Sequence, residues 1–214
     1  MELFANQKRL MTKSSSRQIC LFAVMFLTYH SFSQKQTTVD VTRVTRVAFL
    51  NPGFSYEDRV GRLQTVHFDA YLSTSAYYSY SSSLGTNAGI YFDPALMVQY
   101  RYYYNAAARE SKGRRTERNS MNYIGPMFDV AFSKAAVTEQ SLEEENRRPI
   151  STVGFIWGIQ RNYKKRFSLD LNVGLGYYFT QGTELDYYGQ PVKISQSGFT
   201  VPTNISLGFW LNKR

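Results

Sequence analysis

The sequence of 214 residues has one cysteine and two histidines. A disulfide-bonded scaffold needs paired cysteines, and a structural zinc site needs clustered cysteine and histidine side chains. The sequence therefore excludes both. It also lacks low-complexity tracts, and 43% of its residues are apolar, which is enough for a folded domain. Its most unusual feature is the abundance of aromatic residues, with seventeen tyrosines and fifteen phenylalanines.

The first 33 residues have the pattern of a secretory signal peptide. A basic leader precedes an uncharged apolar run over residues 19–28, and the small residues Ser31 and Ser33 form a cleavage pattern. The run is about half as long as the ~20 residues that a membrane-spanning helix needs. We expect cleavage after Ser33, which gives a signal peptide over residues 1–33 and one domain over residues 34–214.

After the leader, apolar and polar residues alternate along the chain. In residues 167–179 every odd position is apolar or aromatic, whereas the even positions are mostly small or polar. Successive side chains of a β-strand point to opposite faces of a sheet, so this pattern predicts a strand with one apolar face and one small polar face. Seven such strands are expected, over residues 44–56, 63–75, 90–102, 122–132, 152–162, 167–179 and 199–211. The predicted fold class is all-β.

The composition of the polar faces favours a membrane sheet over a soluble one. Water-facing positions of a soluble sheet are rich in long charged side chains. The polar faces of the strands predicted here consist mainly of Gly, Ser, Asn, Thr and Asp. Small polar residues fit a narrow interior, and large apolar ones fit contact with lipid. Every backbone amide must be paired in lipid, so a spanning sheet closes into a barrel. We expect an antiparallel up-and-down transmembrane β-barrel in the outer membrane, with its apolar faces outward.

Seven strands are one short of an even number, and single-chain bacterial barrels have even numbers. We therefore expect about eight strands, with the missing strand in residues 37–45 or in the loop around residues 184–195. Eight strands leave room in the interior only for side chains, so no solute flow is expected.

The expected connections sort by charge. Connectors 57–62, 104–118 and 163–166 share a strongly basic end with the C-terminal tail, whereas the longer connectors at the other end are slightly acidic. Short turns at the basic end indicate that it faces the periplasm. We expect a short helix or cap over residues 105–112.

Four segments resemble a known family. They are residues 49–57 (FLNPGFSYE), 101–105 (RYYYN), 112–116 (KGRRT) and 119–124 (NSMNYI). They are similar to segments of small, mostly uncharacterised outer-membrane β-barrel proteins of Bacteroidota-type bacteria, and the resemblance covers most of the chain after the leader. It implies contact with outer-membrane lipid and insertion by the barrel assembly machinery, which reads a C-terminal aromatic residue. Phe209 and Trp210 lie near that position. The resemblance implies no catalytic residues.

His67 is the only histidine after the leader, and it shares a strand face with Thr65, Asp69 and Ser73. A serine, a histidine and an acid within hydrogen-bond reach are what a lipid hydrolase or acyltransferase requires. Two residues along a strand place His67 and Asp69 about 7 Å apart. The expected inward position turns His67 away from lipid, so we favour a polar contact that fills the interior and assign no catalytic residue.

Four aspartates point inward by the same alternation, and Arg101 and Arg161 are available to balance them. The four are Asp69, Asp93, Asp129 and Asp170. A metal site and a salt-bridged core are the two alternatives. Buried charges have to be paired, which favours the salt-bridged core. No metal-binding or cofactor-binding residue is assigned.

The basic segment 109–118 lacks interleaved aromatic residues, and we expect no nucleic-acid partner for an exported chain. The sequence thus predicts a monomeric, non-enzymatic outer-membrane β-barrel with an envelope or surface role. Its function would lie in loops 75–85, 133–149 and 180–198, whose ligand the sequence does not identify. The alternatives are a lipid-modifying outer-membrane barrel enzyme and a soluble exported lipocalin-like binding barrel.

Overall fold

The computed structural model describes residues 37–81, 85–135 and 145–212, and only the backbone between residues 75 and 91. These residues form one antiparallel sheet of nine strands, which confirms the predicted all-β class. The strands are β1 (Val44–Leu50), β2 (Gly53–Gly61), β3 (Gln64–Ser81), β4 (Gly85–Tyr102), β5 (Asn122–Ser133), β6 (Arg148–Asn162), β7 (Phe167–Leu185), β8 (Pro191–Thr200) and β9 (Thr203–Trp210). No described helix is long and apolar enough to cross a membrane. The predicted signal peptide lies outside the described residues.

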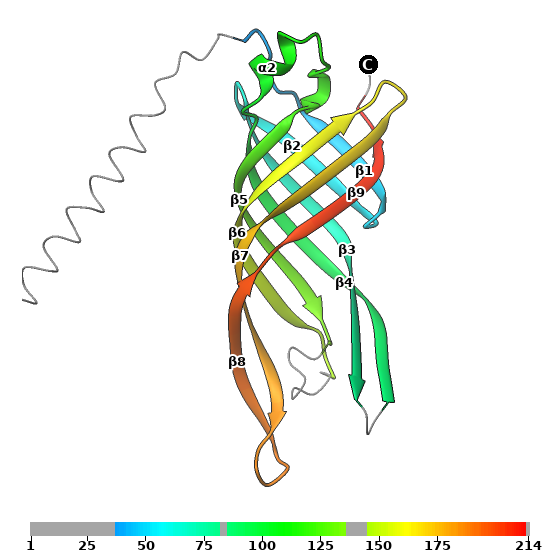
Figure 1. Cartoon of the computed structure of the whole chain (residues 1–214), viewed down its shortest axis with the longest axis vertical. Coiled ribbons are helices and arrows are strands. Elements are labelled where there is room, and N and C mark those ends of the chain that lie inside the picture. The colour runs from blue at the N-terminus through cyan, green and yellow to red at the C-terminus, as the bar shows by residue number, and fades with distance from the viewer. Residues whose placement is uncertain (1–36, 82–84, 136–144, 213–214) are drawn as a thin grey trace, which may run out of the picture. The chain divides into compact units, whose positions relative to one another are not determined.

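The strands are hydrogen-bonded in a ring (Figure 1). Each strand from β1 to β7 pairs with the next one along the chain, and β9 pairs with both β7 and β1. Within the described residues β8 pairs only with β7, on the same edge of β7 that β9 occupies further along. The two are separated at Val201 and Pro202, because proline has no N–H to donate to the ladder.

The prediction of a single strand over residues 44–56 is wrong. These residues belong to two strands, β1 and β2, which pair with each other across a turn at Asn51 and Pro52. Asn51 has a φ of 51°, a left-handed conformation that asparagine adopts more readily than most residues. This split supplies one strand that the seven-strand prediction lacked. The predicted strand over residues 199–211 is also divided, and β8 begins in the loop around residues 184–195 where an additional strand was sought.

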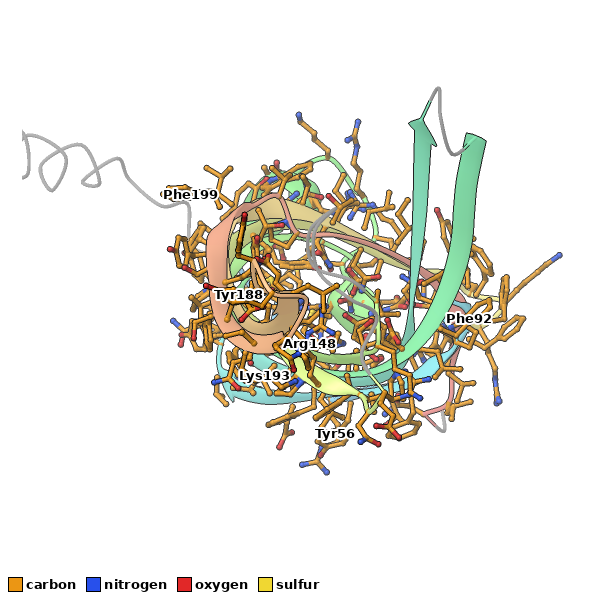
Figure 2. All side chains as sticks on the ribbon, turned by 90° about the horizontal axis from the view of Figure 1, so that it is seen from below. Tyr56, Phe92, Arg148, Tyr188, Lys193 and Phe199 are labelled. Atoms are coloured by element: carbon orange, nitrogen blue, oxygen red, sulfur yellow. The ribbon has the colours of Figure 1, made fainter. Side chains whose placement is uncertain are left out.

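The predicted arrangement of faces is confirmed. On the outer face Leu175 is 75% exposed and Phe155 is 55% exposed. Other exposed side chains of this face are Phe68, Leu72, Phe92, Leu96, Val98, Phe128, Val153, Trp157, Val173, Tyr177, Phe179 and Phe199. The inner face buries Thr65, His67, Asp93, Gln99, Arg101, Gln160, Asn162, Ser168, Asp170 and Asn172. Figure 2 shows Phe92 and Phe199 pointing away from the ring, whereas Arg148 lies toward its middle.

One end of the ring is covered by a cap formed by residues 103–121. The cap contains the helix α2 (Ala106–Glu110) and the short 3-10 helix η2 (Glu117–Asn119), so the predicted short helix is confirmed. Figure 1 shows α2 at the end where β6 turns into β7. An apolar cluster lies between the cap and the ring. It contains Val41, Met97, Tyr103, Ala106, Met121, Tyr123, Met127 and Ile156.

The chain segment before β1 is bonded to this cap. The backbone N–H of Thr42 donates to Asn119 Oδ1 (2.8 Å), and Asn119 Nδ2 donates to the Thr42 carbonyl (2.7 Å). Glu110 Oε2 accepts from the Thr37 hydroxyl (2.5 Å), and Glu110 Oε1 accepts from the Thr38 hydroxyl. The cap therefore holds residues 37–42 against the ring.

We expect the attachment of residues 37–38 to weaken in acid. Hydrogen bonds from Thr37 and Thr38 hold the pKa of Glu110 below its ordinary value of 4.5. A lowered carboxyl pKa stabilises the folded contact above that ordinary value, and the stabilisation is lost as the pH falls through the lowered pKa. The protection of the amides of residues 37–39, which is the intrinsic exchange rate at each pH divided by the observed rate, should fall as the pH drops below 4.5. The Glu110→Gln variant should show low protection already at pH 5 and little further change; an identical acid response in both proteins would contradict this assignment.

Candidate functional site

The interior beneath the cap is organised around the Asp170 carboxylate. Asp170 Oδ2 accepts hydrogen bonds from Arg46 Nη1 (3.1 Å) and Arg101 Nη1 (2.8 Å), and Oδ1 accepts from the Tyr123 hydroxyl (2.7 Å). The Arg101 guanidinium also lies over the Tyr123 ring, 4.1 Å from its centroid. One carboxylate on β7 thus connects β1, β4 and β5 across the interior. All four side chains are buried, which is tolerable because each charge is paired.

A second buried carboxylate, Glu57, connects the ring to the cap. Glu57 Oε1 accepts from the hydroxyls of Thr65 (2.8 Å) and Tyr103 (2.5 Å) and from Asn119 Nδ2 (2.9 Å), and Oε2 accepts from Gln160 Nε2 (3.1 Å). The prediction that Glu57 belongs to a connector over residues 57–62 is wrong, because β2 continues to Gly61 and its alternation turns Glu57 inward. The negative charge of Glu57 therefore belongs to the interior.

His67 lies inside the ring, as predicted, and is 2% exposed. Its Nε2 is 2.7 Å from Arg46 Nη2. An arginine can only donate, so Nε2 accepts and the imidazole carries its proton on Nδ1. Nδ1 has no hydrogen-bond partner among the described residues. Thr65 donates to Glu57, so the hydrogen bonds of this face do not join His67 to a hydroxyl nucleophile or to Asp69.

The four predicted aspartates lie on the inner face and have different partners. Asp170 has two arginines, Asp93 Oδ1 accepts from Arg147 Nη1 (2.6 Å), and Asp129 Oδ1 accepts from the Tyr71 hydroxyl (2.8 Å). Asp69 is half-buried. The interior beneath the cap is therefore the salt-bridged core that the sequence favoured.

The prediction that Arg161 balances these acids is wrong. The buried residues Gln160 and Asn162 precede and follow it on β6, so strand alternation places Arg161 on the outer face. There its Nη2 donates to Asn122 Oδ1 (2.7 Å). Arg46 on β1 takes the expected place beside Arg101.

Sequence reasoning missed Arg46, Tyr103 and Tyr123. Arg46 was missed because residues 44–56 were treated as one strand of uneven alternation. Tyr123 was missed because only small polar side chains were expected on the inward faces. A usable signal was present, since Tyr123 precedes Gly125 and Asp129 at even spacing and therefore shares their inward face.

Tyr123 can occupy its position only because residue 158 on β6 is glycine. A Cβ atom added to Gly158 would lie 2.2 Å from Tyr123 Cζ and 2.5 Å from its hydroxyl oxygen. We expect Gly158→Ala to move Tyr123 away from Asp170 and to lower the free energy of unfolding by about 1–3 kcal/mol, as overpacking does.

Denaturant unfolding in detergent measures this effect. Gly198→Ala is the matched control, because its added Cβ would meet the edge of Tyr178 at 3.1 Å, in a half-exposed place where that ring can shift. The expected decrease in the free energy of unfolding is smaller for Gly198→Ala than for Gly158→Ala. Equal losses in the two variants would show that Tyr123 is not held as described.

Away from the cap, the interior contains a cavity of about 180 Å³. Its lining is predominantly polar. The residues are Tyr71, Ser73, Met97, Met127, Asp129, Thr152, Asn172, Thr200, Pro202, Thr203 and Asn204. Within the described chain, no three His, Cys, Asp or Glu side chains are grouped to hold a metal ion. The interior therefore has two parts, a bonded network under the cap and a small polar cavity beyond it.

Comparison with protein-family models, curated proteins and solved structures found no match for this chain. The function proposed for it therefore rests on its own geometry.

Proposed function

We propose that this chain is a non-enzymatic outer-membrane β-barrel protein with an envelope or surface role. The observation that carries the proposal is the reversed distribution of side chains, apolar on the outside of the ring and polar on the inside. A soluble lipocalin-like barrel has the opposite arrangement and would bury side chains such as Phe155 and Leu175. Exposed apolar surface on this scale is typical of contact with a membrane or a partner.

The backbone supports the same placement. In hydrocarbon every N–H and C=O must find a partner in the protein, and a ring of strands meets that need where an open sheet does not. The strands β5, β6 and β7 have 12, 15 and 19 residues. A membrane-spanning strand tilted by about 45° needs roughly 9–11 residues, so these strands are long enough to cross and to project beyond the bilayer.

The capped end is proposed to face the periplasm. Basic side chains gather in the cap and in the β6–β7 turn, among them Arg109, Lys112, Arg114, Lys164 and Lys165. Bacterial barrels keep short turns on the periplasmic side, and the β2–β3 and β6–β7 connections at this end are short. The loops at the other end would then face outward and carry the surface role, in a monomer inserted by the barrel assembly machinery.

The test is fractionation with gel mobility. Expressed with its leader in a Gram-negative host, the protein should be found in the outer-membrane fraction and require detergent for extraction. Unboiled protein should migrate differently from boiled protein, because a closed sheet resists unfolding by the detergent. Recovery in the periplasmic fraction without detergent would overturn the proposal in favour of the soluble binding barrel.

A lipid-modifying enzyme is the second candidate. The observation that favours it is that Nδ1 of buried His67 has no partner in the part of the chain that the structure describes. We expect His67→Gln to leave lipid A and phospholipid profiles unchanged by mass spectrometry, because His67 is bonded to Arg46 and not to a nucleophile. The control strain lacks the protein altogether. A modified lipid that disappears in both the variant and the control strain would establish the enzyme instead.

A further inference from the structure

The outer face contains a groove of about 530 Å³ between β6, β7 and β8. Val153, Leu175, Tyr177, Phe199 and Val201 form its apolar lining. Phe199 is 92% exposed and meets the Tyr177 ring edge-to-face, with 5.4 Å between centroids. A groove with this lining suits a hydrocarbon chain better than water.

The groove and the polar interior cavity lie on opposite sides of one short piece of chain. Thr200 lines both of them, Val201 lines the groove, and Pro202 lines the cavity. The ladder with β7 is interrupted here, and one bond, from the Gly174 N–H to the Pro202 carbonyl (3.0 Å), holds the segment in place. The apolar groove and the polar cavity are thus separated by the thickness of a single strand.

This piece of chain also borders an open edge of the sheet. β1 follows β9 only as far as Leu50 opposite Leu207 and then turns away at Asn51. Asn51 Nδ2 donates to Asn204 Oδ1 (2.6 Å), which fixes the turn against β9. No described strand pairs with the remaining edge of β8. A flexible chain can therefore pass round β8 from the cavity to the groove without breaking any ladder hydrogen bond.

The cavity favours a small head group that donates hydrogen bonds. Its volume is about six times the ~30 Å³ that one water molecule occupies in the liquid. Asp129 is the ionisable acid in its lining, and the structure gives it one donor, the Tyr71 hydroxyl. Arg46 and Arg101, two buried cations of the interior, are both bonded to Asp170. A cationic amine would complement Asp129, whereas a carboxylate would be repelled.

We propose that this chain binds a single-chain amphiphile with a cationic amine head group. The head group occupies the cavity beside Asp129, Asn172 and Asn204, and the hydrocarbon chain passes over the edge of β8 into the groove at Phe199. This proposal rests on the outer-membrane placement proposed above, and it names the class of ligand for which that placement leaves room.

Native mass spectrometry of the detergent-purified protein tests the proposal with two probes that share one chain length, dodecylamine and dodecanoate. We expect one bound dodecylamine per chain and at least tenfold weaker retention of dodecanoate. Asp129→Asn should weaken dodecylamine retention about tenfold, and Phe199→Ala should weaken it severalfold. Equal retention of the two probes, or retention that neither substitution changes, would overturn the proposal.

Two matched controls separate the site from general effects. Asp58→Asn removes an exposed carboxylate that pairs with Arg43, and Phe68→Ala removes an exposed ring of the outer face away from the groove. Both should retain dodecylamine as the parent protein does, and heat-modifiable mobility verifies that every variant is folded. Recovery of the protein from the periplasm with selective, Asp129-dependent retention would overturn the membrane placement alone. An outer-membrane protein without such retention would overturn the amphiphile site alone.

Discussion

Asp170→Asn should lower the free energy of unfolding by about 3–5 kcal/mol, the usual result of removing one partner from a buried ion pair. The asparagine keeps the size of the side chain and can still accept hydrogen bonds. It loses the negative charge that lies 3.1 Å from Arg46 and 2.8 Å from Arg101. The Arg101 guanidinium would then lose its paired carboxylate, and of the described ion-pair partners Arg46 would keep only Glu57, whose Oε2 is 3.8 Å from Arg46 Nη2. The measurement is urea unfolding of the purified protein in detergent or lipid vesicles.

Asp58→Asn is the matched control for this experiment. Asp58 also pairs with an arginine, Arg43 at 3.0 Å, but the two side chains are 40% and 61% exposed. Exposed pairs contribute little to stability because water screens them. A loss at Asp170 no larger than the loss at Asp58 would mean that the interior is hydrated and that the network is not a structural core.

Leu175→Arg should lower the free energy of unfolding from a bilayer by about 2–4 kcal/mol if the outer face contacts lipid near the midplane. Leu175 is 75% exposed on β7 and has Val173 and Tyr177 on either side of it on the same face. In a water-exposed sheet, an arginine at such a position changes stability by no more than about 0.5 kcal/mol. The same substitution thus gives two well-separated results for the two environments.

Tyr187→Arg provides the comparison, because Tyr187 is 96% exposed in the turn between β7 and β8. Its replacement should have no measurable effect in either environment. Both variants are measured in vesicles by urea titration of the gel-mobility shift. Neutral behaviour of Leu175→Arg would contradict the membrane placement even if the protein were recovered with the outer membrane.

The arrangement of faces could be predicted because the face of each residue follows from its near neighbours in the sequence. In β3, β5, β6 and β7 each side chain is assigned by its neighbours two residues away, and no long-range information is needed. The turn at Asn51 was harder to find, since Asn51 and Pro52 interrupt an apolar run without ending it. Once that turn was missed, the inward positions of Arg46 and Glu57 could not be assigned.

The partners of the interior network could not be predicted from the sequence. Asp170 meets Arg46 and Arg101, which are 124 and 69 residues away along the chain. The alternation predicts that each of these side chains points inward, but it does not predict the height of each side chain, which is its position along the axis of the ring. That height follows from the register between strands, such as Gln160 opposite Asp170, and register depends on the turns.

Closing the ring has a consequence for how the chain is made. β1 is held by β9 and by Asn212, whose Oδ1 accepts from the Thr45 N–H (2.8 Å). The cap in turn holds β9, where Arg118 stacks on Trp210 at 4.0 Å. Contacts between residues so distant in sequence form slowly. Until Trp210 has been synthesised, β1 and β7 each present an unpaired edge, the kind of surface at which nascent chains aggregate. Both edges are therefore covered only when the last strand, β9, has been added to the sheet.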